Sequence, residues 1–152
     1  MHTAKQLSVS LVNKPGRLAD MLAGLSKGKV SFRALAVMDS GDRGTVRFVP
    51  DDVDAARRVL DSMNVKYEAT DVLMADVPNQ AGGFRKVCER LAAEHLNIDY
   101  AYCSLQMPGK GHGGVAAVIK VNDMAKARRV LNENGSANRR KATPGRRPVA
   151  LR

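Results

Sequence analysis

Two patterns of hydrophobic and polar positions follow each other along the N-terminal half of this chain. Leu7, Val9 and Leu11 alternate with polar residues, which is the period-2 pattern of a strand with one buried face. An apolar stripe with helical spacing comes next and consists of Leu18, Met21, Leu22 and Leu25. Alternation and turn residues then predict strands over 30–38, 45–49 and 65–69, with a helix over 53–63. The predicted order is therefore βαββαβ.

The same unit occurs a second time. The helical stripe returns sixty-six positions later as Phe84, Val87, Cys88 and Leu91. The five letters of residues 56–60 recur unchanged at 127–131. This copy predicts strands over 71–77, 97–106 and 115–121 and helices over 82–95 and 122–132, the last capped by Asn122. One small module has been duplicated, so we expect a functional site where module meets module.

The second copy has no alternating apolar segment where its fourth strand is expected. After Asn134-Gly135 the apolar alternation stops. A sheet that ends there has an unpaired edge, which is prone to association. We therefore predict that another subunit or the neighbouring module occupies this edge.

These patterns predict an α+β fold of two ferredoxin-like βαββαβ modules in tandem, with antiparallel sheets and the helices on one face. The expected divisions are residues 1–70, residues 71–135 and a tail, 136–152. Six of the twenty-five basic residues lie in this tail, and all fifteen acidic residues precede it. The formal charge of +10 thus falls to +4 without the tail. The tail has no apolar periodicity, so we predict that it is disordered.

Composition argues against several classes of protein. No apolar run approaches the roughly 20 residues that span a bilayer, so we expect no membrane association. Cys88 and Cys103 are too few for a disulfide framework, and no leader pattern precedes the first strand, so the expectation is a cytoplasmic protein. Both cysteines are predicted to be buried. The three histidines have no spacing that suits zinc, so we expect neither metal nor cofactor.

The turn between the first strand and the first helix carries the candidate chemistry. Asn13 ends the strand, Pro15 fixes φ, and Gly16 lets a ligand approach the backbone without a Cβ in the way. The backbone N–H groups and positive dipole end of the next helix would form a site for a carboxylate-sized anion. Gly28 is expected to end this helix at positive φ.

Through this turn the sequence resembles the ACT domain, a small βαββαβ regulatory module of amino-acid biosynthetic enzymes and stand-alone sensors. The resemblance rests on Asn13-Lys14-Pro15-Gly16-Arg17-Leu18 and on the element order of both copies. It implies an amino acid held between paired domains, with its charged groups at the turn backbone and at an Asn-type side chain. The candidate ligand-binding residues are Asn13, Lys14, Pro15, Gly16, Arg17 and Leu18.

The corresponding second turn supplies six further candidates: Asn79, Gln80, Ala81, Gly82, Gly83 and Phe84. It departs from the motif, with Ala81 for Pro15, Gly83 for Arg17 and Phe84 for Leu18. This second site could bind weakly or differently, or could serve as a wall of the first.

The leading interpretation is a non-catalytic regulatory protein that binds an amino acid and acts as a homodimer or on a partner enzyme. No nucleophile, base and orienting group are clustered in the sequence, so we expect no catalytic residues. One alternative is a nucleic-acid or anionic-partner binding protein that uses the basic tail. The sequence offers few exposed aromatic residues in support of this alternative. Tyr100 and Tyr102 are expected on the same strand face as Ile98, where they could belong to the core. The other alternative is a structural adaptor subunit of a biosynthetic enzyme.

Overall fold

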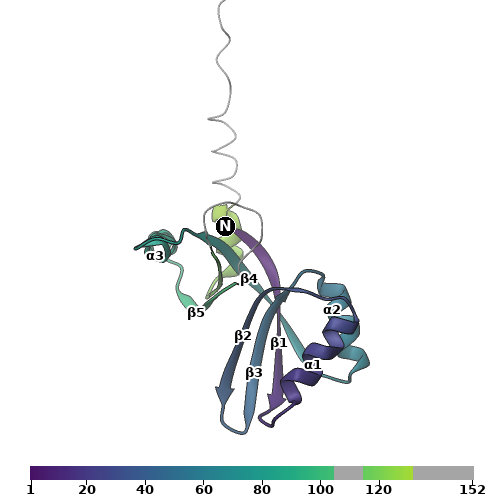
Figure 1. The fold of residues 1–152 in the computed structure, drawn as a ribbon. Coiled ribbons are helices and arrows are strands. Elements are labelled where there is room, and N and C mark those ends of the chain that lie inside the picture. The colour runs from purple at the N-terminus through teal and green to yellow at the C-terminus, as the bar shows by residue number, and fades with distance from the viewer. Residues whose placement is uncertain (105–114, 132–152) are drawn as a thin grey trace, which may run out of the picture.

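A computed structural model describes residues 1–104 and 115–131 of the chain (Figure 1). A fourth helix covers residues 124–131. The other elements are β1 (His2–Val12), α1 (Arg17–Lys27), β2 (Phe32–Ser40), β3 (Arg43–Pro50), α2 (Val53–Ser62), β4 (Tyr67–Val77), α3 (Gly83–Ala93), β5 (Ile98–Cys103) and β6 (Val115–Val121). The predicted tail at 136–152 lies outside the described residues. The predicted α+β fold is confirmed.

The six strands form one antiparallel sheet in the order β2-β3-β1-β4-β6-β5. The expected last strand of the first copy and first strand of the second are one continuous strand, β4, of 11 residues. Residues 67–74 of β4 pair with β1, and residues 73–77 pair with β6. The expected division between residues 70 and 71 therefore falls inside a strand that both modules share.

The N-terminal half of β1 occupies the edge that the second module leaves open. His2 pairs with Met74 and Lys5 with Asp71, on the side of β4 that faces away from β6. In the first module the corresponding place is taken by β4 itself. The prediction named another subunit or the neighbouring module, and the structure shows that the neighbouring module covers this edge, with β1.

Both helical layers cover the same face of the sheet. In β4, Tyr67 packs on the first hydrophobic core, and Leu73 and Ala75 belong to the second. These residues are separated by even numbers of positions, so their side chains share one face of the strand. The first core lies under α1 and α2, around Phe48, Leu7, Met21 and Leu60. The second contains Leu91 of α3 and Ala127 of the fourth helix.

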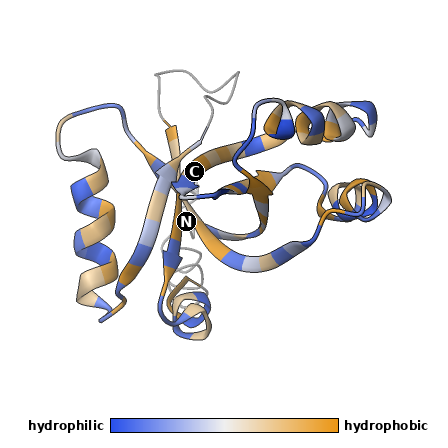
Figure 2. Ribbon diagram, turned by 90° about the horizontal axis from the view of Figure 1, so that it is seen from below, coloured by the Kyte–Doolittle hydropathy of each residue, from blue (hydrophilic) through white to orange (hydrophobic). Residues whose placement is uncertain are grey.

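The opposite face of the sheet has a core of its own, built from strands alone. Buried members come from β2, β3, β4 and β6, and they are Ala34, Val49, Val72, Met74 and Val118. A single bridge between Ala34 and Ser104 joins the two ends of the sheet. The sheet therefore curls until its edge strands meet, which encloses this face. Figure 2 shows the twisted strands, along which hydrophobic and hydrophilic residues alternate.

Gly28 ends α1 as predicted, but two details of the predicted helix ends are wrong. Gly28 has φ −78°, and Lys29 takes the positive φ instead, at 57°. A Cβ at Gly28 would lie 2.4 Å from Cγ2 of Val59, so glycine is needed for close packing of α1 on α2. The fourth helix is capped by Asp123, whose carboxylate accepts from Lys126 N at 2.8 Å. Asn122 instead accepts from Asn97 N, which ties the helix to the start of β5.

The second module differs from expectation at two further positions. Cys88 is half-buried, but Cys103 on the edge strand β5 is exposed, so its predicted burial is wrong. Tyr102 packs on the strand core, whereas Ile98 packs on the second helical core. A register shift between Ile98 and Tyr100 separates them, because an irregularity of this kind reverses the alternation of faces. Within the described residues, no helix is long and apolar enough to cross a membrane.

Candidate functional site

The first predicted turn connects β1 to α1 and is anchored on one side. Asn13 N donates to Asp42 O at 2.9 Å, and the Asn13 side-chain amide contacts Gly41 O at 3.4 Å. Arg43 adds a 2.7 Å hydrogen bond from Nε to the hydroxyl of Ser10. The β2–β3 hairpin therefore fixes the end of β1, and the Asn13 side chain is directed to that hairpin rather than to the helix.

The second predicted turn has the same backbone geometry. Gly16 and Gly82 precede their helices with φ of 87° and 78°. Three backbone hydrogen bonds of the first turn recur sixty-six residues on: Lys14 N to Val12 O and Gln80 N to Pro78 O, Arg17 N to Lys14 O and Gly83 N to Gln80 O, and Asp20 N to Gly16 O and Lys86 N to Gly82 O. The duplication seen in the sequence is therefore a duplication of turn structure.

The four helices begin in two different ways. Asp52 caps α2 by accepting from Ala55 N at 3.0 Å, and Asp123 caps the fourth helix. At Gly16 and Gly82, no side chain among the described residues caps the helix. The first-turn N–H groups of a helix lack intrahelical acceptors, and they carry the positive end of the helix dipole. The two glycine turns thus leave open the donors that aspartate satisfies elsewhere.

The space next to both glycines is free. A Cβ built at Gly16 or at Gly82 would have nothing within 4 Å. Gly83 differs, since its Cβ would lie 2.4 Å from the carbonyl oxygen of Pro78. Gly16 and Gly82 therefore serve the left-handed turn and leave the backbone accessible, whereas Gly83 is required for the packing of α3 against the preceding loop.

The remaining candidates divide into exposed residues and residues that contact a core. Leu18 packs against the first core, and its counterpart Phe84 is 40% exposed. The others are exposed, and they are Lys14, Pro15, Arg17, Asn79, Gln80 and Ala81. The two turns lie at opposite ends of the β1–β4 ladder, because β1 and β4 run antiparallel and each turn follows the end of its strand. Within one chain, each turn is therefore a separate surface.

A buried polar network lies on the other face of the sheet, where sequence analysis proposed no site. Gln6 is completely buried. Its Nε2 donates to the Tyr100 hydroxyl at 2.7 Å, and its Oε1 accepts from the Tyr102 hydroxyl at 2.8 Å. Burial, with the nearby Tyr100, raises the pKa of Tyr102, so its hydroxyl remains a donor at neutral pH. The network joins β1 to β5 and so connects the two modules.

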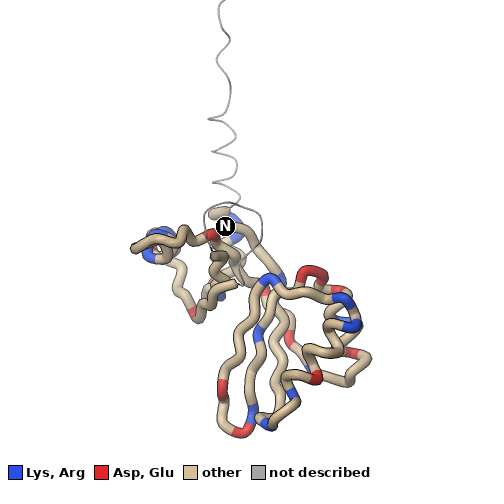
Figure 3. Tube along the Cα trace, in the orientation of Figure 1, with Lys and Arg blue, Asp and Glu red and all other residues tan. Residues whose placement is uncertain are grey.

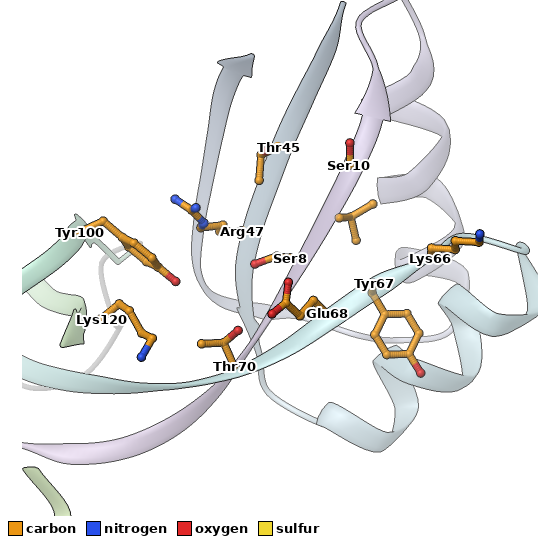
Figure 4. A pocket seen from close by; sticks show the side chains of 11 residues that line it. Ser8, Ser10, Thr45, Arg47, Lys66, Tyr67, Glu68, Thr70, Tyr100 and Lys120 are labelled. Atoms are coloured by element: carbon orange, nitrogen blue, oxygen red, sulfur yellow. The ribbon is translucent and has the colours of Figure 1, made fainter. Parts of the chain in front are cut away.

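A hollow of about 520 Å³ opens beside this network (Figure 4). We call it the strand hollow. Its lining includes Arg47, Tyr100 and Lys120, and the Arg47 guanidinium lies 4.0 Å from the centre of the Tyr100 ring. Ser8, Thr70 and Glu68 face the same space, while Lys66 points away from it (Figure 4). None of the twelve predicted site residues lines this hollow.

Sequence reasoning could have found part of this lining. Gln6, Ser8 and Ser10 form a polar row at every second position of β1, and Lys120 interrupts an apolar strand. Such residues are normally attributed to solvent. Only the curled sheet shows that Gln6 is buried and that Ser8, Ser10 and Lys120 line one hollow.

Comparison with known families identifies the fold type. Residues 2–138 match the family described as the ACT domain pair. The chain belongs to the ACT domain pair family. This membership confirms the resemblance drawn from the glycine turns, and it supports a regulatory, ligand-binding role for the protein.

Solved structures give the same result. Protein BT0572 from Bacteroides thetaiotaomicron is 32% identical, with a TM-score of 0.75, and the match covers 88% of this chain and 89% of that one. The regulatory subunit of aspartate kinase from Thermus thermophilus, in a ligand-free form, is 15% identical with a TM-score of 0.55, over 77% and 82% of the two chains. The subunit from Thermus flavus is 14% identical with a TM-score of 0.51, over 78% and 87%. At these lower identities the similarity shows the fold alone. The comparison with curated proteins gives no match.

The described part of the chain gives little support for a metal site or for a nucleic-acid interface. No group of three or more His, Cys, Asp or Glu residues is placed there to hold a metal ion. Basic and acidic residues are interspersed over the described strands and helices (Figure 3). Mixed charges of this kind do not form the continuous basic stripe that a nucleic-acid interface requires.

Proposed function

We propose that the protein is a non-catalytic regulatory protein that binds an amino acid at the turn formed by Asn13, Lys14, Pro15, Gly16, Arg17 and Leu18. The ligand carboxylate would accept hydrogen bonds from the first turn of α1. The amino acid would change how modules or subunits pack, and through that change the activity of a partner.

The observation that carries this proposal is the difference between the helix starts. In the described part of the chain, two helices have an aspartate cap, and the two that follow the glycine turns have no side-chain cap. A carboxylate from solution would have the same chemistry at Gly16 that the Asp52 side chain has at α2. Open space beside Gly16 leaves room for it. Fold similarity to regulatory subunits of aspartate kinase agrees with this role.

The second turn is proposed as a second site of the same kind, built from Asn79, Gln80, Ala81, Gly82, Gly83 and Phe84. It has the same hydrogen bonds and the same open glycine. It lacks a cation at the place of Arg17, because Gly83 stands there and is buried. We therefore expect it to bind the ligand more weakly than the first turn.

A thermal-shift screen against the twenty amino acids tests the proposal. A ligand at about 100 times its Kd stabilises a protein by roughly 2.7 kcal/mol. For a chain of this size each kcal/mol raises Tm by about 2–4 °C, so a true ligand gives a clear shift. We expect one amino acid or one chemical class to respond. A flat panel from folded protein would contradict the proposal.

Matched glycine variants locate the site. Gly16→Val places a side chain where the ligand would approach, and it has no protein neighbour to displace. Gly82→Val imposes the same left-handed strain at the second turn. In calorimetric titrations, Gly16→Val should abolish the tighter binding event and Gly82→Val only the weaker one. Unchanged binding by Gly16→Val would show that the ligand binds elsewhere.

The proposed partner is a second copy of the chain or a regulated enzyme. Val37 and Met38 on the edge strand β2 are 52% and 38% exposed. An edge strand with exposed apolar residues is suited to association. Light scattering with and without the responsive amino acid should show a ligand-dependent change in mass or in partner binding.

A further inference from the structure

We propose that the strand hollow binds a small hydroxylated oxyanion, a molecule that carries a carboxylate or phosphate group together with a hydroxyl. The hollow lies in a different part of the molecule from the glycine turns and shares no residue with them. This proposal is therefore independent of the amino-acid site.

Two cations that face the hollow have no acidic partner among the described residues. The ion pairs of the described residues join Lys5 and Arg128 to Asp71, and Arg85 to Glu89. Arg47 and Lys120 take part in none of them, although both are half-buried. Partial burial of a charge costs free energy unless an opposite charge or hydrogen bonds compensate for it. An anion in the hollow would compensate both cations at once.

Both cations have hydrogen-bond donors to spare. The Arg47 guanidinium has five N–H groups, and its recorded hydrogen bond goes to the thioether sulfur of Met38 at 3.6 Å, a weak acceptor. Lys120 uses one donor of its ammonium group on Val121 O at 2.9 Å. Stacking on Tyr100 holds the guanidinium plane in place. A pre-oriented guanidinium of this kind suits carboxylate and phosphate oxygens.

The rest of the lining indicates a hydroxylated ligand. Ser8, Thr70 and Glu68 also face the space (Figure 4). Ser8 pairs with Arg47, and Glu68 lies one strand further from Arg47. A carboxylate such as Glu68 accepts from a ligand hydroxyl but repels a second anionic group. The volume of about 520 Å³ lies in the range of small-molecule sites, roughly 300–1,000 Å³. The hollow thus fits a compact molecule with its charge at one end and a hydroxyl at the other.

The ligand would contact both modules. Arg47 belongs to β3, and Lys120 to β6, at opposite sides of the strands β1 and β4. Binding would therefore stabilise the curled sheet, in which the modules are held together by Gln6 and the two tyrosines. The hollow is a place where a metabolite can affect how the modules pack without contact with the glycine turns.

Titration calorimetry at constant ionic strength tests this inference with two probes that carry one anionic group each, D-glycerate for a carboxylate and glycerol 3-phosphate for a phosphate. Propionate and propyl phosphate lack the hydroxyls of these probes and serve as matched controls. We expect saturable binding of one probe, tighter than its control. The probe that binds shows whether the site prefers a carboxylate or a phosphate group. If neither probe binds saturably, the proposal is wrong.

Variants assign the binding to the hollow. Arg47→Met and Lys120→Met should each weaken binding about tenfold or more, because each removes a charged hydrogen bond. Lys66→Met, which removes a lysine that points away, should leave the affinity unchanged. If Arg47→Met fails to fold without its tyrosine contact, Lys120→Met still decides the question. Equal affinity in Lys120→Met and in the Lys66→Met control would overturn the proposal.

The two proposed sites can be tested independently of each other. Gly16→Val should abolish the tighter amino-acid binding event and leave binding of the oxyanion probes unaffected, and Lys120→Met should do the opposite. An amino acid whose binding depends on Lys120 but not on Gly16 would place the amino-acid site in the hollow and overturn the turn site.

Discussion

Gln6 Nε2 donates a 2.7 Å hydrogen bond to the hydroxyl of Tyr100, a residue ninety-four positions further along the chain. The same amide accepts from Tyr102 through its oxygen. One buried side chain of β1 therefore forms hydrogen bonds with two tyrosines of β5, on the face of the sheet opposite the described helices. This network, with the bridge between Ala34 and Ser104, links the far edge of the second module to the first.

Replacement of Gln6 by leucine should lower the free energy of unfolding by about 2 kcal/mol, because a buried hydrogen-bonding group left unsatisfied costs about 1–3 kcal/mol. Leucine has a similar size, so packing changes little. Urea unfolding measures the difference. Ser8→Ala is the control, since Ser8 accepts a longer bond of 3.2 Å from Gln6, and it should cost far less. Wild-type stability in Gln6→Leu would show that the network contributes nothing.

Deletion of residues 1–5 should loosen the second module specifically. These residues pair with β4 from Asp71 to Met74, and Met1 packs on the second core. Without them the edge of β4 is open, so amide exchange in residues 72–77 should rise and the protein should associate at high concentration. Residues 67–69 pair with the retained part of β1 and provide the internal control. A uniform rise in exchange would instead indicate global destabilisation.

Asp71 should make stability depend on pH in the acid range. Its hydrogen bond from Lys5, at 2.5 Å, together with the charges of Lys5 and Arg128, lowers the pKa of its carboxyl against the effect of burial. The ionised form is thus favoured in the folded state. Its stabilisation is fully present above the unfolded-state pKa of about 3.9 and is lost as pH falls through the lower folded-state value.

Asp71→Asn is therefore expected to lower stability at pH 7 by about 1 kcal/mol, the upper range for partly exposed ion pairs. The difference from wild type should shrink as the pH is lowered below about 4. Glu89→Gln breaks an exposed pair with Arg85 and should cost less than about 0.5 kcal/mol at any pH. A constant effect of Asp71→Asn across the acid range would contradict the role of its charge.

Two adjacent glycines should respond differently to alanine. Gly82→Ala places a Cβ in open space but at φ 78°, which costs about 1–2 kcal/mol. Gly83→Ala places a Cβ 2.4 Å from a backbone oxygen, so α3 must shift. We expect the larger loss of stability from Gly83→Ala, measured by thermal unfolding. A larger loss from Gly82→Ala would mean that relieving the clash at Gly83 costs less free energy than holding alanine at positive φ in the turn.

Local features of the fold were predictable from the sequence. The helix of residues 17–27 was located by its apolar stripe, and both glycine turns by their strand-ending asparagines. These features depend on contacts within a few residues of each other. The second turn was predicted because the sequence pattern repeats after 66 residues. The backbone hydrogen bonds of the two turns recur at the same offset.

Other features could not be predicted because they depend on residues far apart in the sequence. Alternation places Gln6 on the polar face of β1, but it does not show that Tyr100 covers it. The irregularity between Ile98 and Tyr100 moves Tyr102 to the other face, and no pattern in the sequence marks it. Arg47 reads as an exposed cation until the curled sheet brings it to Tyr100.

The sequence by itself determined the elements, their order, the duplication and the glycine turns, since each follows from periodicity or from the φ preference of single residues. Only the tertiary structure decided that β4 is one strand shared by two modules and that β1 completes the second. It also decided that the sheet curls around a polar hollow. Strand pairing satisfies backbone groups without regard to side-chain identity, so a sequence pattern shows which face is buried but not which strand lies next to it.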